Sequence, residues 1–364
     1  MLSSIFGRRP TRQTVREVLE ASGLSPEEID AAEGDGTDEL LAIDQVVLPD
    51  ALEYDIDELA ETSGLQVEEI RGYWRALGFA DPAEGERVFS KIDVEILQSV
   101  SAFQDGLTDP LLSLQMTRVL GASMARFATA VVEAGEARST GRHEAIIEGD
   151  ADVVAEYEAS SLAVRSGNLL PFLTEVMEYA FRRHLRAAAR RRITLATVAE
   201  GDGLTVGFAD MVRFTKLSQQ LDDHGLARLV TQFGEITNEI VATNGGRIIK
   251  MIGDEAMFTA EVPEQAAQIG LELAAVFRER EDLPGVRVGL ASGPVLARDG
   301  DVYGPVVNLA SRLVEASRTD SVVVSQATRD HLVGDPAFRL RSLGMKHLRH
   351  IGTVRFYRLS QGTG

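Results

Sequence analysis

Residues 204–215 read LTVGFADMVRFT, in which an apolar segment meets one acidic residue and then turns polar. The first six residues, LTVGFA, have the length and the apolar content of a buried β-strand. Asp210 stands where that strand leaves the core. A single aspartate after a strand is usually a turn or helix-cap residue. Whether Asp210 has a chemical role therefore depends on what the rest of the chain brings to the same place.

The segments that follow alternate between strand and helix patterns. We expect a long helix over about residues 218–242, two strands around a tight turn, a helix from Pro263, a further strand, a second helix around Asn308, and short strands to the end. The expected strands are GRIIKM (246–251), EAMFTA (255–260), VRVGLASG (286–293) and VVVS (322–325). The first part has the order β-α-β-β-α-β, which predicts an α+β domain with a ferredoxin-like sheet.

The predicted sheet order gives Asp210 a partner. In a β-α-β-β-α-β sheet the first strand ends at the same edge as the turn between the second and third strands. That turn is MIGDEAM, which contains Gly253 and Asp254. Two carboxylates far apart in the sequence should therefore meet, and Mg²⁺ binds to a few carboxylates together with substrate phosphates. The six histidines are scattered, so a histidine-based metal site is a poor alternative.

The first half of the chain has a different pattern. From about residue 11 to 195 apolar residues recur three or four apart, as in LLSLQMTRVLGASMARFATAVVEA (111–134), which predicts helices. A helix is expected to begin at Pro171 and to end in a basic segment, which suits a helix C-terminus. We therefore expect a helical domain over residues 1–170, a connecting helix and linker over 171–202, and an α+β domain over 203–364.

Composition narrows the class of protein. The chain has 364 residues, a net charge of −19 and no cysteine, so disulfides and thiolate metal sites are excluded and a cytoplasmic location is expected. No apolar run approaches the roughly 20 residues of a membrane span, and the N-terminus lacks a signal-peptide pattern. The negative charge argues against a general nucleic-acid binder.

One N-terminal stretch nevertheless resembles a DNA-binding helix-turn-helix of the MerR type. It is YDIDELAETSGLQVEEIRGYWRALG, residues 54–78. A reading helix needs donors and positive charge, but helix 67–77 begins with Glu68 and Glu69 and offers only Arg71 and Arg75. The alternative is a helical hairpin packed inside a larger helical domain, with Trp74 in the core.

Three motifs together resemble a known family. FADMVRFT, IIKMIGDEAM and GDVYGPVVNLASRL, in this order and spacing, resemble the catalytic domain of class III adenylyl cyclases over about residues 203–360. The whole arrangement resembles the soluble actinobacterial cyclases that carry an inhibitory, pH-responsive regulatory domain. The resemblance implies an enzyme that converts ATP to 3′,5′-cyclic AMP and pyrophosphate, with residues 1–170 as the regulatory domain.

The resemblance assigns roles to individual residues. Asp210 and Asp254 match the metal-binding aspartates, with the main-chain carbonyl of Met211 as a further ligand for two Mg²⁺ or Mn²⁺ ions per site. Lys250 and Asp301 match the purine-selecting pair. Adenine presents an acceptor at N1 and a donor at its 6-amino group, which a lysine and a carboxylate complement, whereas guanine reverses the polarity.

The remaining site residues come from the second half of the domain. Asn308 and Arg312 match the pair that orients the ribose and stabilises charge on the phosphates; four residues apart, they share one face of a helix. Arg349, in KHLRHIG, stands at the position of a phosphate-contacting lysine. Since the family's metal and base-selecting residues act from opposite sides of an interface, a single copy of the domain implies a head-to-tail homodimer with two equivalent sites.

The sequence also departs from the family pattern and leaves alternatives open. Arg213 replaces a small residue, Pro305 replaces a polar residue and His350 replaces a glycine.

Two other cyclase families are alternatives. The turn IGDEA is similar to the hairpin of diguanylate cyclases, but the Lys, Asp, Asn and Arg set argues against that family. A guanylyl cyclase requires other residues at positions 250 and 301.

The regulatory signal stays undecided between pH, for which His143 and His184 are the candidate sensors, and an apolar ligand such as a lipid. A nucleotide-sensing transcription regulator with an inactive cyclase-like domain is the rival reading.

Overall fold

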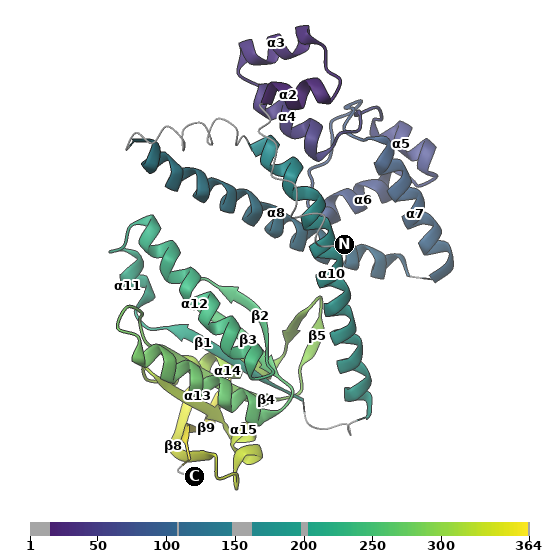
Figure 1. The fold of residues 1–364 in the computed structure, drawn as a ribbon. Coiled ribbons are helices and arrows are strands. Elements are labelled where there is room, and N and C mark those ends of the chain that lie inside the picture. The colour runs from purple at the N-terminus through teal and green to yellow at the C-terminus, as the bar shows by residue number, and fades with distance from the viewer. Residues whose placement is uncertain (1–14, 108, 148–161, 198–202, 363–364) are drawn as a thin grey trace. The chain divides into compact units, whose positions relative to one another are not determined.

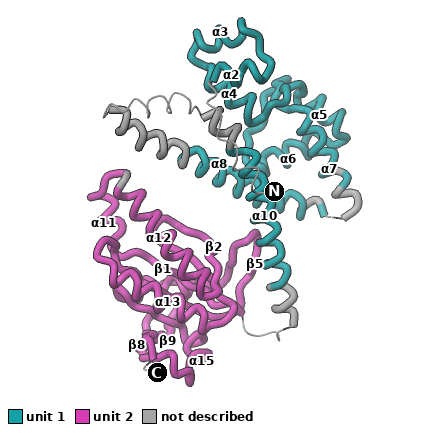
Figure 2. The backbone as a smooth tube through the Cα atoms, viewed as in Figure 1, with its two compact units in different colours: residues 1–193 teal, residues 194–364 magenta. Residues whose placement is uncertain are grey.

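The computed structural model describes residues 15–107, 109–147, 162–197 and 203–362. The chain divides into two compact units, residues 1–193 and 194–364 (Figure 2).

The second unit, here called the catalytic unit, alternates strands and helices (Figure 1). Its strands are β1 (Leu204–Met211), β2 (Arg247–Ile252), β3 (Glu255–Ala260), β4 (Val286–Gly293), β5 (Leu296–Arg298), β6 (Asp301–Tyr303), β7 (Ser321–Ser325), β8 (Phe338–Leu348) and β9 (Gly352–Gln361). Its helices are α11 (Phe214–Ser218), α12 (Asp223–Thr243), α13 (Pro263–Glu279), α14 (Pro305–Ala316) and α15 (Gln326–Leu332).

Seven of the strands form one sheet in the order β2-β3-β1-β4-β7-β9-β8, and β5 and β6 form a separate hairpin. The pairs are antiparallel except β4 with β7. The first four strands and their helices have the order β1-α12-β2-β3-α13-β4, which confirms the predicted ferredoxin-like arrangement. The register pairs Asp210 with Glu255, so β1 does end beside the β2–β3 turn.

Each face of this sheet has its own core. One core joins α12, α13 and α15 to sheet residues such as Met211 and Phe258. The other joins α14 to residues such as Val206 and Phe208. Because side chains alternate along a strand, Asp210 shares the α14 face with Val206 and Phe208.

Gly289 explains how α14 lies so close to the sheet. A Cβ atom at this position of β4 would come within 2.5 Å of the Ala310 carbonyl oxygen and 2.6 Å of the Val314 nitrogen. Any larger residue would push α14 outward, because a packed interior does not yield easily. The glycine therefore fixes the height of the helix that carries Asn308 and Arg312.

The first unit, here called the N-terminal unit, is helical in its described residues. Its helices are α2 (Val15–Ala21), α3 (Pro26–Asp35), α4 (Asp38–Val47), α5 (Ile56–Ser63), α6 (Val67–Leu77), α7 (Lys91–Leu107), α8 (Pro110–Ile147) and α10 (Leu162–Thr197). Two small cores lie within it. Val18, Leu19, Ile29 and Ala42 form one, and residues from α5, α6 and α7 together with Phe89 form the other.

The predicted helical hairpin is present as α5 and α6. Trp74 is half-buried, packs against the second of these cores and lies 4.9 Å from the Phe89 ring centre, while its indole Nε1 donates to the Ala80 carbonyl at 2.7 Å. Arg75 contacts Asp81 at 2.6 Å, and Arg71 lies 3.6 Å from the same carboxylate. Both arginines of the supposed reading helix are thus held by an acid of this chain.

Two helix starts differ from expectation. The helix expected from Pro171 begins at Leu162 and runs through that proline, so the residue lies in its interior. The helix expected from about residue 218 is broken: α11 ends at Ser218 and α12 begins at Asp223. Asp222 is the reason, because its carboxylate accepts from the Gly225 amide at 2.8 Å and caps the new helix.

Within the described residues no helix combines the length and apolar content that a membrane crossing needs.

Candidate active site

The edge of the sheet at the end of β1 carries the two predicted metal-binding aspartates. The Met211 amide donates to the Asp254 carbonyl at 3.0 Å, which joins the end of β1 to the β2–β3 turn. Gly253 takes φ 61° in that turn, a conformation that glycine adopts without strain. Asp210 is 16% exposed, so its carboxylate sits in a partly buried position at this edge.

A cation that the sequence analysis missed lies beside Asp210. Arg287 on β4 stands directly opposite Asp210 in the register and forms an ion pair with its carboxylate. Its Nε is buried and has no hydrogen-bond partner among the described residues. VRVGLASG is predicted as a strand from its sequence, and the pairing of β4 with β1 brings its single arginine opposite Asp210.

Negative charge accumulates here despite Arg287. The pKa of Asp254 is raised, first by burial and then by the charge of Asp210, although its own amide and Arg287 oppose the shift. The pKa of Glu255 is raised to about 7, again first by burial and then by Asp210 and Asp254. Three carboxyl groups share one cation, so a further positive charge would stabilise the site.

The donor set suits a hard divalent cation that also binds substrate. Among the described residues, no three His, Asp or Glu side chains converge as a closed metal site. Two carboxylates with a nearby backbone carbonyl at Met211 leave several coordination positions for phosphate oxygens and water, which is how Mg²⁺ is usually bound.

A second constellation joins β2 to the small hairpin. The Lys250 Nζ donates to Asp301 Oδ2 at 2.6 Å, across 51 positions of sequence. Asp299 and Gly300 both take positive φ in the turn before Asp301, and this aspartate–glycine turn folds β6 back beside β5. Burial acts to raise the pKa of Asp301, but hydrogen bonds from Lys250 and the Val302 amide outweigh it and lower that pKa.

The predicted transition-state pair lies on α14. Val306, Ala310, Leu313 and Val314 are buried, and Asn308 is on the exposed side. Arg312 is 37% exposed and forms an ion pair with Glu315, one turn along the helix. Pro305 occupies the first turn of α14, where a missing amide hydrogen costs nothing.

Arg349 is far from this edge in its own chain. It lies in the turn between β8 and β9, whose register places that turn at the opposite end of the sheet from Asp210. An eight-residue strand such as β1 spans roughly 25 Å, which exceeds the reach of an arginine side chain. His350, beside it, takes φ 64°, where the family's glycine would be unstrained.

Arg213 also takes a left-handed conformation, with φ 66° and ψ 20°, at the start of α11. For an L-residue other than glycine this costs about 1 kcal/mol or more. The predicted pH sensors lie in the N-terminal unit: His184 is exposed on α10, and His143 belongs to α8, with a side chain outside the described ones.

Comparison with known proteins gives this geometry a context. Residues 197–361 match the adenylate and guanylate cyclase catalytic domain, and residues 7–189 match the adenylate cyclase regulatory domain. An adenylate cyclase of Streptomyces coelicolor is 32% identical over 314 residues, which cover 85% of this chain and 80% of the relative. One from Glutamicibacter nicotianae is 30% identical and covers 84% and 78%.

A pH-sensitive adenylate cyclase of Mycobacterium tuberculosis is 26% identical to this chain. The match covers 97% of this chain and 89% of the relative. Among solved structures, the adenylyl cyclase CyaB from P. aeruginosa is 22% identical, with a TM-score of 0.39 over 45% of this chain and 96% of that one. A TM-score in this range adds nothing to the assignment, which rests on the sequence relatives and the two matched domains. The chain therefore belongs to the class III adenylate cyclases, with an adenylate cyclase regulatory domain ahead of the catalytic domain.

Proposed function

We propose that this chain converts ATP to 3′,5′-cyclic AMP and pyrophosphate. The observation that carries the proposal is the contact of Lys250 with Asp301 at 2.6 Å. It sets a donor and an acceptor side by side on the unit that carries the Asp210–Asp254 edge. A lysine donor matches adenine N1 and a carboxylate acceptor matches the 6-amino group, whereas guanine presents the opposite pattern.

Asp210, Asp254 and the Met211 carbonyl are the groups that would hold Mg²⁺ or Mn²⁺, two ions per site. The accumulated negative charge at this edge fits such ions. When bound, the ions would favour ionisation of the ribose 3′-hydroxyl and neutralise the triphosphate during in-line attack at the α-phosphorus.

The chain's other residues position the nucleotide. Asn308 orients the ribose, and Arg312, once drawn from Glu315, offers a guanidinium to charge that develops on the α-phosphate. Arg349 takes the terminal phosphates. We add Arg287 to this set, because it brings a fixed positive charge to the edge where the phosphates would lie.

The positions of these residues favour an active site made by two copies of the chain. Asp210 and Arg349 lie at opposite ends of one sheet, so a single copy cannot place both on one triphosphate. A head-to-tail homodimer brings Asp210 of one copy to the Arg349 end of the other and generates two equivalent sites.

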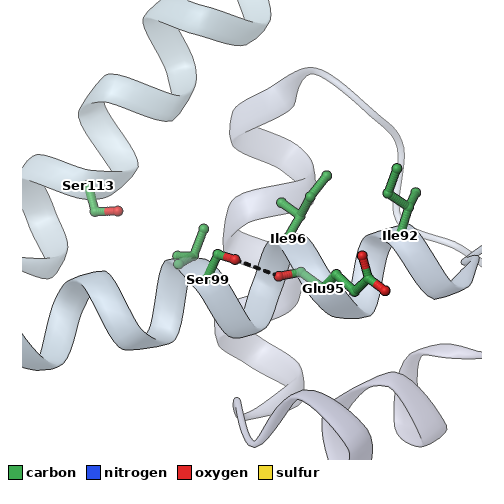
Figure 3. Close-up of a pocket in the computed structure, with 6 residues that line it drawn as sticks. Ile92, Glu95, Ile96, Ser99 and Ser113 are labelled. Atoms are coloured by element: carbon green, nitrogen blue, oxygen red, sulfur yellow. Dashed lines mark hydrogen bonds between the residues drawn. The ribbon is translucent and has the colours of Figure 1, made fainter.

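The N-terminal unit is proposed to control the geometry of this dimer. An apolar ligand is one candidate signal. A cleft of about 490 Å³ lies along α7 and reaches Ser113 of α8, and Ile92 and Ile96 of α7 line it (Figure 3). Val100, a further four residues along α7, also lines it. Glu95 at its rim would disfavour an anionic headgroup. The other candidate signal is pH, with His184, which is exposed on α10, as the candidate sensor.

The alternative function, a transcription regulator, would need arginines on α6 that are free to contact DNA. Arg71 and Arg75 of α6 both contact Asp81, and Arg75 also lies 3.7 Å from Glu68. A phosphate backbone would have to displace these acids before either arginine could bind it.

The test is cyclic AMP formation from ATP with Mg²⁺ or Mn²⁺, across about pH 5.5 to 8. We expect Asp210→Asn to lower kcat by roughly 10³-fold or more, because the metal-binding charge is lost. Asp282→Asn, which removes an exposed acid paired with Arg280, is the matched control and should retain activity. No cyclic AMP from the unmodified chain with either metal would overturn the proposal.

A further inference from the structure

The last two strands of the catalytic unit, β8 and β9, form a hairpin whose charge is opposite to that of the chain (Figure 1). Residues 336–362 contain no aspartate or glutamate, although the chain as a whole has a net charge of −19. The basic side chains of the hairpin are all exposed, and within the described part of the chain none of them forms an ion pair. They are Arg339, Arg341, Lys346, Arg349, Arg355 and Arg358.

Three of these arginines share one face of the hairpin, away from the turn that carries Arg349. On the side of the sheet covered by α12, α13 and α15 the hairpin contributes apolar residues, which are Phe338, Leu340, Tyr357 and Leu359. Because side chains alternate along a strand, Arg339, Arg341 and Arg358 lie on the opposite face. We call these three residues the arginine cluster. Arg341 stands directly opposite Arg358 in the register. Like charges in such a pair destabilise a sheet, so an anionic surface against this face would be stabilising.

Exposed apolar side chains accompany the arginine cluster on the same strand. β8 is the outermost strand of the sheet, and its pairing is irregular between Ser342 and Met345. In this stretch Leu343 is 45% exposed and Met345 is 63% exposed. The aromatic rings of the hairpin, in contrast, are buried or half-buried. The hairpin therefore presents guanidinium and aliphatic groups together, but no open ring on which a nucleobase could stack.

We propose that this hairpin binds a membrane surface rich in anionic lipids. The arginine cluster would contact the charged headgroups, and Leu343 and Met345 would enter the layer between them. Cations close to an anionic bilayer and apolar side chains inserted at its boundary both strengthen such binding. The negative charge of the rest of the chain does not prevent the contact, because charges more than about 8 Å apart are largely screened at physiological salt. The proposal does not depend on the proposed reaction.

The experiment is co-sedimentation of the full-length chain with vesicles of phosphatidylglycerol and phosphatidylcholine, compared with vesicles of phosphatidylcholine alone. We expect binding to the anionic vesicles only, and weaker binding as the salt concentration rises. Arg341→Gln combined with Arg358→Gln should weaken binding by roughly 25-fold, about fivefold for each cation. Met345→Ser should also weaken binding, but it should leave the salt dependence unchanged, because it removes no charge.

The matched control removes two exposed arginines from helices on the other face of the sheet. Arg228→Gln on α12 combined with Arg278→Gln on α13 changes the net charge by the same amount and should bind as the unmodified chain does. The variant of the arginine cluster loses a like-charge pair, so its melting temperature should be unchanged or higher. Weaker binding by that variant would therefore not reflect unfolding.

Four outcomes would overturn the proposal. One is equal binding by the unmodified chain and the variant of the arginine cluster, and another is equal binding to vesicles with and without the anionic lipid. Single-stranded RNA that binds more tightly than the vesicles at the same salt, and that is lost in the same variant, would assign the hairpin to nucleic acid. A lower mass of that variant in sedimentation velocity without vesicles would assign the cluster to an interface between copies of the chain.

Discussion

Helix α14 of the catalytic unit and helix α8 of the N-terminal unit both carry apolar residues three or four apart, but they bury them differently. On α14, Val306, Ala310, Leu313 and Val314 are all buried against the sheet. On α8 the apolar side chains are exposed over most of the described part: Leu111, Leu112, Met116, Val119, Leu120, Met124, Phe127 and Val132. The same periodicity thus predicts an amphipathic helix in both places, but only α14 buries its apolar face, while α8 packs against α6 mainly near Leu114 and Gly121.

The reason lies in what each helix has beside it. A central strand such as β1 or β4 must pair with a strand on each side, because its buried backbone N–H and C=O groups need hydrogen-bond partners. This pairing builds the sheet, and the sheet gives α14 a defined apolar surface to pack on. A helix satisfies its backbone internally, so α8 forms whether or not its apolar face is covered.

The largest expected effect contrasts a covered leucine with an uncovered one in the N-terminal unit. Leu59 is fully buried on α5, and Leu59→Ala should lower the free energy of unfolding by about 2 to 5 kcal/mol. Leu120 is 54% exposed on α8, and Leu120→Gln should change the free energy of unfolding by no more than about 0.5 kcal/mol. Urea unfolding followed by the fluorescence of Trp74, the chain's one tryptophan, reports on this unit.

A large loss of stability in Leu120→Gln would break the contrast. It would mean that the apolar face of α8 is covered in solution, and sedimentation at several concentrations would then show whether a second copy of the chain covers it.

The next effect tests the packing of α14 against its strand. Gly289→Ala places a Cβ within 2.5 Å of the Ala310 carbonyl oxygen and should destabilise the catalytic unit by about 1 to 3 kcal/mol. Gly234→Ala on α12 is the matched control, because its new Cβ meets nothing nearer than the Met251 methyl group at 4.0 Å. The control should be neutral or stabilising by up to about 1 kcal/mol. Far-UV circular dichroism during thermal unfolding compares the two, and equal melting temperatures would contradict the proposed close contact.

A smaller effect concerns the choice of purine. Asp301→Ala removes the acceptor for the adenine 6-amino group and the partner of Lys250. We expect kcat/KM for ATP relative to GTP to fall by roughly 10- to 100-fold, the value of one hydrogen bond to a charged group. Asp282→Ala is the control, since that exposed acid contacts Arg280. An unchanged ratio of the two nucleotides would remove Asp301 from the selecting pair.

The smallest effect is a pH dependence of stability at the metal edge. The pKa of Glu255 in the folded chain is about 7, above its ordinary value of 4.5, so the folded state binds more protons than the unfolded state between these values. The contribution of Glu255 to the free energy of unfolding therefore decreases as the pH rises through this window. Without divalent ions, the melting temperature of the unmodified chain should fall by a few degrees relative to Glu255→Gln. Parallel curves for the two proteins would show that Glu255 is not buried as described.

The sequence was most informative where local patterns determine pairing. The alternation of LTVGFA, the glycine–aspartate turn at 253–254 and the helix from Pro263 predicted the ferredoxin-like order, and that order placed Asp210 beside Asp254. The Asp299–Gly300 pair is an equally strong turn signal, and it forms the β5–β6 hairpin that we did not predict. Arg287 was missed because an arginine inside a strand pattern has no special meaning until the register shows that it faces Asp210.

Helix boundaries were harder to predict, because they depend on single capping contacts. The Asp222 carboxylate starts α12 five residues later than the apolar pattern suggested. Pro171 is predicted as a helix start, yet α10 continues through it. The arrangement of the two catalytic units in a dimer also lies beyond pattern analysis, because it depends on surfaces that one chain leaves uncovered.

The central claim, one active site made by two copies, is tested most directly by mixing two inactive variants. Asp210→Asn lacks the metal carboxylate, and Arg349→Ala lacks the guanidinium at the opposite end of the sheet, so each homodimer should be inactive. Refolded together in equal amounts, half of the dimers would be mixed, and each mixed dimer would hold one intact site of two. The account predicts cyclic AMP formation at about one quarter of the unmodified rate. A mixture as inactive as its components, at concentrations where the unmodified chain is an active dimer, would contradict it.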